Sequence, residues 1–170
     1  MDKDIQTALN EQIRHEFTAA YLYLGMMAWF ETRSLPGFGH WMRLQAQEEL
    51  AHAMKLVDFV LDRGGKVELG DVAAPGIDFE SPHAVMKAAL EHERRVTGLI
   101  NRVYALASAK NDYPAQVLMQ WFVAEQVEEE KNAGEIADQL AFAGDSASAI
   151  LVLDGRLAAR QPGEGDGGEG

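Results

Sequence analysis

The sequence predicts an all-α fold, a four-helix bundle with one long crossover and a short fifth helix. Four long segments repeat apolar residues at the helical spacing of three or four. The links before the second and fourth segments are short, whereas the link between the second and third covers residues 64–80 and has no helical pattern. Short links join antiparallel neighbours, and a link as long as 64–80 can run the length of the bundle. One long crossover therefore follows.

Turn and capping residues place the ends of the expected helices. Pro36 and Pro82 suit first turns because proline has no backbone N–H and a fixed φ. Gly64 and Gly144 suit helix C-termini, and Asp145 or Ser146 would cap the fifth segment. We expect one domain over residues 1–160 and a flexible, acidic, glycine-rich tail over 161–170. The expected helices cover about residues 4–33, 36–63, 82–110, 115–143 and 147–160.

The composition favours a soluble, cytoplasmic protein that binds cations. Of 170 residues, 47% are hydrophobic and 25% are charged, which is ordinary for a globular domain. The net charge of −12 disfavours nucleic acid and anionic membranes as partners. The N-terminal residues do not read as a secretory signal, and the longest apolar run, Ala19 to Phe30, is too short to span a membrane. The absence of cysteine excludes disulfides, zinc ribbons, cysteine-ligated iron–sulfur clusters and thiol nucleophiles.

One glutamate interrupts the apolar stripe of each long helix. Ionised carboxylates in a dry core are strongly destabilising unless they are paired. The stripes do not each supply an arginine or lysine to pair them. Two divalent cations would neutralise four carboxylates, so the sequence predicts a two-metal site inside the bundle. The four residues are Glu16, Glu49, Glu93 and Glu129.

The residues around these glutamates suggest which metal binds and how. His52 lies one turn after Glu49, so both side chains can reach the same ion. Carboxylates with one imidazole suit iron(II) or manganese(II). Bundles of this kind carry a second Glu-x-x-His pair, but here Glu129 is followed three residues later by Asn132. Gln126, one turn before Glu129, is expected to hydrogen-bond to a metal-bound oxygen species.

The missing second histidine predicts two unequal metal positions. The tighter position would use Glu16, Glu49 and His52. The weaker position would use Glu49 as a bridge, together with Glu93 and Glu129, and would have no imidazole.

Each of these residues also has an ordinary structural interpretation. Most helical glutamates are solvated, and a single interior histidine is more often hydrogen-bonded in a core than bound to metal. Four glutamates in matching positions together with the histidine spacing favour the metal site. We interpret Tyr23 as a residue beside the site and Trp121 as core packing, although either could donate an electron. The remaining histidines are expected at the surface or as caps: His15, His40, His83 and His92.

The chain resembles the bacterial non-haem ferritins as far as about Arg160. The resemblance rests on LNEQIRHEFTAAYLYLGMMAWF, QAQEELAHAMKLVDFV, HE at 92–93, NDYPAQVLMQWFVAEQVEEEK and the short fifth segment. It implies a ferroxidase centre, an intrasubunit di-iron site that oxidises iron(II) with dioxygen or hydrogen peroxide. The family's motif falls on Glu16, Glu49, His52, Glu93, Gln126 and Glu129.

The resemblance implies further features that the spacing of the residues does not. A nearby third iron position matches Glu48, Glu125 and Glu128 together with Glu129, and a family tyrosine matches Tyr23. The implied assembly is a hollow 24-subunit shell that stores iron(III) as a mineral and whose fifth helices line a symmetry axis. The implied function is iron storage and detoxification.

Four alternatives to a non-haem ferritin are a bacterioferritin, a rubrerythrin-like peroxidase, a di-iron oxidase or oxygenase without storage, and a helical scaffold without catalysis. A bacterioferritin would need histidine at position 132 and a haem-ligating methionine at position 50, where this chain has Asn132 and Leu50. Haem is therefore not expected, although Met54 lies one turn along the same face. Rubrerythrin-like peroxidases need cysteines for their second iron site. A di-iron oxidase or oxygenase without storage, and a helical scaffold without catalysis, stay open at this point.

Overall fold

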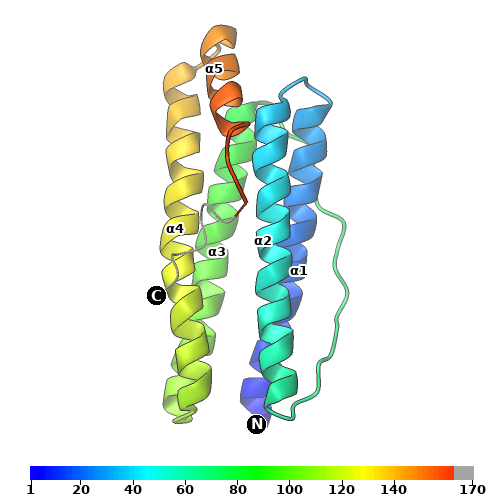
Figure 1. Ribbon diagram of the computed structural model, residues 1–170, viewed down its shortest axis with the longest axis vertical. Coiled ribbons are helices and arrows are strands. Elements are labelled where there is room, and N and C mark those ends of the chain that lie inside the picture. Colours follow the sequence, from blue (N-terminus) through cyan, green and yellow to red (C-terminus); the bar gives the residue numbers. More distant parts are fainter. Residues whose placement is uncertain (163–170) are drawn as a thin grey trace.

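The computed structural model describes residues 1–162 as an all-α bundle (Figure 1). Helix α1 packs along α2 and α3 packs along α4, while the 63–81 connection runs along the outside of the bundle from one end to the other. The predicted fold class and long crossover are confirmed. The predicted tail lies outside the described residues from position 163 onward. The helices are α1 (Lys3–Glu31), α2 (Pro36–Asp62), α3 (Pro82–Ala109), α4 (Tyr113–Ala143) and α5 (Ala147–Leu157).

Side-chain caps begin four of the five helices. The carboxylate or hydroxyl of each cap accepts a backbone N–H of the first turn, which otherwise lacks a partner. The caps are Asp2 for α1, Ser81 for α3, Asp112 for α4 and Ser146 for α5.

Within the described chain, no helix has the length and apolar character that a membrane crossing requires.

Two helix ends differ from the expected ones. Helix α4 begins at Tyr113, earlier than predicted, because Asp112 is its cap and Pro114 fits within its first turn. Helix α5 ends at Leu157 rather than at Arg160. Beyond Leu157 the chain turns back along α2, where His40 Nε2 donates a hydrogen bond to the Arg160 carbonyl oxygen at 2.9 Å.

A polar layer divides the interior of the bundle into two apolar clusters. The cluster near α5 includes Phe30, Phe38 and Met42. The cluster at the opposite end includes Leu9 and Leu56. The candidate metal ligands therefore lie in the middle of the bundle, with packed apolar side chains on both sides. The buried polar residues of this layer are Gln12, Glu16, Gln45, Glu49, His52, Glu93, Glu125, Gln126 and Glu129.

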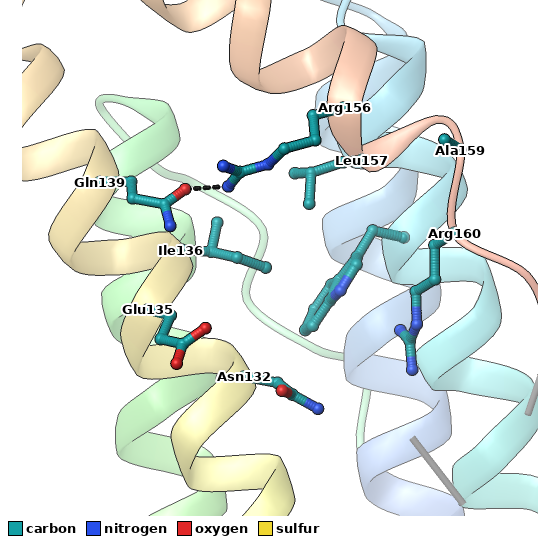
Figure 2. A pocket seen from close by; sticks show the side chains of 9 residues that line it. Asn132, Glu135, Ile136, Gln139, Arg156, Leu157, Ala159 and Arg160 are labelled. Atoms are coloured by element: carbon teal, nitrogen blue, oxygen red, sulfur yellow. Dashed lines mark hydrogen bonds between the residues drawn. The ribbon is translucent and has the colours of Figure 1, made fainter. Parts of the chain in front are cut away.

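Helix α5 covers one end of the bundle and docks on the start of α2. The buried Asp154 carboxylate accepts a hydrogen bond from the backbone N–H of Phe38 at 2.9 Å. It replaces the missing side-chain cap of α2, whose own N-cap position is Leu35. Figure 2 shows Arg156 reaching across to Gln139 on α4, to which it donates a hydrogen bond. Helix α5 is thus fixed to both α2 and α4.

Gly37→Ala is expected to displace α5. A Cβ atom at Gly37 would lie 1.8 Å from the Asp154 carbonyl oxygen, a backbone atom that moves only with its helix. We expect a loss of about 1–3 kcal/mol in the free energy of unfolding, typical of overpacking. Chemical denaturation followed by circular dichroism would measure it.

Gly155→Ala is the matched control because Gly155 lies on α5 and an added Cβ meets nothing within 4 Å. Alanine is the better helix former, so this variant should be neutral or more stable by up to about 1 kcal/mol. Equal stabilities for the two variants would contradict the docking described above.

Candidate metal centre

Glu16 on α1 and Glu49 and His52 on α2 form the closest group of possible metal ligands. One ligand atom from each residue lies within 4.8 Å of the other two, and all three residues are buried. The carboxyl groups of Glu16 and Glu49 share a hydrogen bond. His52 Nδ1 lies 3.6 Å from Glu49 Oε2, because the three-residue spacing puts both side chains on one helix face.

Two aromatic rings of α4 hold the His52 imidazole in place. Its centroid lies 5.3 Å from that of Trp121 and 5.7 Å from that of Phe122, both edge to face. The Lys55 ammonium lies 3.4 Å from the Trp121 ring centroid. Trp121 therefore packs directly against a candidate ligand and forms one wall of the site.

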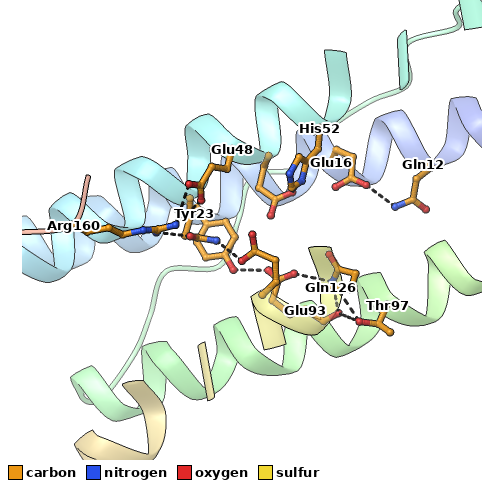
Figure 3. Close-up of polar contacts among 12 residues, drawn as sticks. Gln12, Glu16, Tyr23, Glu48, His52, Glu93, Thr97, Gln126 and Arg160 are labelled. Atoms are coloured by element: carbon orange, nitrogen blue, oxygen red, sulfur yellow. Dashed lines mark hydrogen bonds and ion pairs between the residues drawn. The ribbon is translucent and has the colours of Figure 1, made fainter. Parts of the chain in front are cut away.

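Helices α3 and α4 supply the facing carboxylates (Figure 3). Glu93 accepts hydrogen bonds from the Tyr23 hydroxyl and, at 3.2 Å, from Gln126 Nε2. Glu129 accepts a hydrogen bond from Gln45 Nε2 at 2.7 Å. Each carboxylate is thus oriented by an amide or phenol that is itself buried.

Burial raises the pKa of the glutamates in this layer. The pKa of Glu16 rises to about 7, and that of Glu129 rises to about 8 with a further contribution from the charge of Glu93. The pKa of Glu49 is raised well above its ordinary value by burial and by the charges of Glu93, Glu16 and Glu129. Burial also raises the pKa of Glu93, although hydrogen bonds from Tyr23 and Gln126 oppose this. Carboxyls of this kind retain protons near neutral pH, and a divalent cation would replace those protons.

The residues matched to a third iron position do not form a group of mutually close ligand atoms as Glu16, Glu49 and His52 do. Glu125 is buried and Glu128 is exposed, although both lie on α4. Glu48 is half-buried and forms an ion pair with Arg160 at 2.8 Å. Among residues 1–162, the criterion of mutually close ligand atoms is met by Glu16, Glu49 and His52 and by no group that includes Glu48, Glu125 or Glu128.

Three of the polar side chains that contact the site were not predicted from the sequence. Gln12 donates a hydrogen bond to Glu16 at 2.8 Å, and Gln45 donates one to Glu129. Each glutamine lies one turn before a stripe glutamate on its own helix, which is a signal that the sequence does contain. Arg160 has no comparable signal, because it follows α5 and reaches the site only through the tertiary fold.

His92 is buried, not at the surface as predicted. It is 9% exposed, and its Nε2 has no hydrogen-bond partner among the described residues. Burial, together with the nearby Arg95, lowers the pKa of His92 to about 4, so the ring is neutral at neutral pH. The surface prediction failed because α3 packs against α1 as well as α4, which buries two adjacent faces of α3.

The fold and the polar layer together define a class of protein. Four helices each bring at least one glutamate to a buried layer, and α2 adds a histidine, as in helical bundles with carboxylate-rich metal sites. Residues 6–143 match the ferritin family, described as a ferritin-like domain. The chain belongs to the ferritin family.

Individual relatives match almost the whole chain. It is 39% identical over 162 residues to the bacterial non-heme ferritin of Bacteroides fragilis (strain 638R), covering 94% of this chain and 99% of that protein. It is 34% identical over 160 residues to the bacterial non-heme ferritin of Staphylococcus aureus (strain USA300), covering 94% and 96%. A solved structure of an open pore ferritin from Archaeoglobus fulgidus has a TM-score of 0.94 and 43% identity, covering 95% of this chain and 99% of that one. The predicted resemblance to non-haem ferritins is confirmed.

Proposed function

We propose that this protein stores and detoxifies iron. It binds iron(II) at two positions within one subunit, oxidises it to iron(III) with dioxygen or hydrogen peroxide, and holds the product as a ferric mineral inside a hollow shell. The observation that carries this proposal is the buried group of Glu16, Glu49 and His52, which belongs to the same polar layer as Glu93 and Glu129. Membership of the ferritin family supports iron as the cation.

The two iron positions would differ in strength. Glu16, Glu49 and His52 would hold the first ion, and Glu49 would also bridge to the second, which Glu93 and Glu129 complete. The second position has no imidazole because residue 132 is asparagine, so we expect it to bind more weakly.

Tyr23, which borders the layer, and Gln126, which also belongs to the predicted metal motif, would position the second iron(II) through Glu93. Tyr23 donates to Glu93, and Gln126 donates to Glu93 as well, so both limit how this carboxylate turns. Gln126 would also be placed to hydrogen-bond to an oxygen species bound at the ion. Such orientation by outer hydrogen bonds typically changes metal affinity or activity by about 10–100-fold.

The redox step balances with two iron(II) ions per oxidant. Each ion gives one electron, and dioxygen takes both electrons with two protons to become hydrogen peroxide. When hydrogen peroxide is the oxidant, it takes two electrons and two protons and becomes two molecules of water. The buried layer separates this reaction from bulk solvent, since the apolar clusters close it on both sides.

The remaining parts of the proposal rest on family similarity and charge. A third iron position would use Glu48, Glu125 and Glu128 with Glu129, and 24 subunits would form the shell. Similarity to the Archaeoglobus open pore ferritin over 95% of the chain supports the assembly. We propose a cytoplasmic location with no nucleic-acid or membrane partner, consistent with a net charge of −12.

Anaerobic iron(II) addition followed by exposure to oxygen tests the proposed function. We expect oxygen uptake and ferric absorbance to rise faster than in buffer alone. Two iron(II) ions should be oxidised for each molecule of oxidant consumed. Sizing should show a particle far larger than one 18.7 kDa subunit, with an iron core visible by electron microscopy. Oxidation at the buffer rate would refute the ferroxidase step, and elution as a monomer would refute the shell.

A further inference from the structure

Arg160 brings a positive charge to the outer side of the carboxylate layer. Its Nη2 atom donates to both oxygens of Glu48, at 2.8 and 3.0 Å (Figure 3). The Arg160 side chain is 10% exposed and that of Glu48 is 18% exposed, so the pair is largely shielded from water. A shielded, charge-assisted contact of this kind is stronger than an ordinary surface ion pair.

The same guanidinium is connected to the candidate metal ligands through Gln45. Arg160 Nη1 donates to Gln45 Oε1, and Gln45 Nε2 donates to Glu129 at 2.7 Å. Burial raises the pKa of Glu129, and the positive charge of Arg160 opposes that rise. Arg160 therefore stabilises negative charge on Glu48 by direct contact and on Glu129 through Gln45. A metal cation at this place would do the same.

We propose that Arg160 is a built-in cation of the carboxylate layer, and that it must leave Glu48 before a third metal cation can bind beside the iron pair. This inference rests on the proposed function. The retained arginine and an incoming cation compete for the same Glu48 oxygens. Arg160 would thereby keep the third position weak and make its filling depend on a movement of the segment after α5.

A cavity next to Arg160 gives the side chain somewhere to go. It has a volume of about 430 Å³ and lies between α4 and the segment that follows α5 (Figure 2). Asn132 and Glu135 line its α4 wall, and Trp41, whose ring centroid lies 5.2 Å from the guanidinium carbon, lines the α2 side. The polar groups of Asn132 and Glu135 can receive the guanidinium when it leaves Glu48. Asn132 thus stands both where a second histidine ligand is missing and at the edge of this cavity.

Isothermal titration of the metal-free, full-length protein with Zn²⁺ tests the inference without any redox reaction. The unmodified protein should bind two Zn²⁺ per subunit more tightly and a third more weakly. In Arg160→Gln the third event should tighten about tenfold, the effect expected when a partly buried charge pair no longer competes. The first event, at Glu16, Glu49 and His52, should change little. Thermal unfolding of each variant checks that the bundle is intact.

Three further variants separate this role from simple anchoring of α5. Arg160→Lys keeps the charge but loses the two-oxygen contact, so the third event should tighten by less than in Arg160→Gln; this variant carries the test if the glutamine variant does not fold. Arg156→Gln removes the other arginine that fixes α5, through Gln139, and should leave the third event unchanged. Adding Glu48→Gln to Arg160→Gln should abolish the gain.

The outcomes distinguish this inference from the proposed function. If the first two Zn²⁺ bind but Arg160→Gln leaves the third unchanged, the role of Arg160 is refuted and the iron pair is not. An equal gain in Arg156→Gln, or a gain that survives Glu48→Gln, would refute it as well. If the unmodified protein fails to bind the first two Zn²⁺, the proposed function fails and this inference fails with it.

Discussion

Glu49→Gln is expected to abolish iron(II) oxidation and to make the metal-free protein more stable. Glu49 contacts Glu16 and His52 and would bridge both ions, so a neutral amide removes a ligand from each position. We expect oxidation to slow by more than about a hundredfold, beyond the typical effect of losing an outer hydrogen bond to a metal site. Stopped-flow ferric absorbance would measure the loss of oxidation rate, and Zn²⁺ titration would measure the loss of metal binding.

The gain in stability has a separate cause. The raised pKa of Glu49 means that folding disfavours its charged form, and glutamine removes this penalty at neutral pH. The melting temperature of the metal-free variant should therefore rise. Glu91→Gln, an exposed change on α3 two residues before Glu93, is the matched control and should alter neither property. A Glu49→Gln variant that oxidises iron at the unmodified rate would remove Glu49 from the site.

The metal-free protein is expected to lose stability as the pH rises from about 5 to about 8. The pKa of Glu16 is raised from 4.5 to about 7 and that of Glu129 from 4.5 to about 8. In this range the folded protein keeps protons that the unfolded chain has released. The stabilisation is complete below the unfolded value and is lost as the pH passes through the folded values. Each group contributes up to about 1.4 kcal/mol per pH unit, so the total change is on the order of 5 kcal/mol.

Denaturation of the metal-free protein across this pH range measures how steeply the free energy of unfolding falls with pH. Saturating Zn²⁺ should flatten this dependence, because the cation and not the proton then balances the carboxylates. Glu16→Gln should also reduce it. Buried His92, whose pKa is lowered from 6.5 to about 4, and His15, whose pKa is also lowered, act in the opposite direction up to about pH 6.5, but they are outnumbered by the carboxyls of the layer. The pKa values of Asp2 and Asp112 are lowered from ordinary values that already lie below this range. Stability that is constant or rises from about pH 5 to about pH 8 would contradict the raised pKa values.

The parts of the fold and site that could be predicted from the sequence depend on local rules. Glu16, Glu49 and Glu93 interrupt apolar stripes, and a period of 3.6 residues assigns such positions to the interior. His52 follows from its spacing to Glu49 on one helix face. The crossover follows from the length of one link. Each of these inferences needs a single helix or a single connection.

The missed features depend on how helices meet. The contact of Gln45 with Glu129 joins α2 to α4, and no spacing along either helix specifies it. Arg160 reaches Glu48 only because the chain turns back along α2 after Leu157. His92 is buried because α3 contacts two neighbours at once. Periodicity shows which face of a helix is buried, but not which partner covers the adjacent face.

The division of the interior has a practical consequence for redesign. The two apolar clusters share no residues with the carboxylate layer, although Tyr23 of one cluster donates to Glu93 and Phe122 of the other packs against His52. Heat resistance could therefore be engineered at either end of the bundle by volume-conserving changes alone. The middle layer would tolerate few such changes, because there charge and geometry matter together. A single subunit thus offers two regions open to engineering on either side of one that is not.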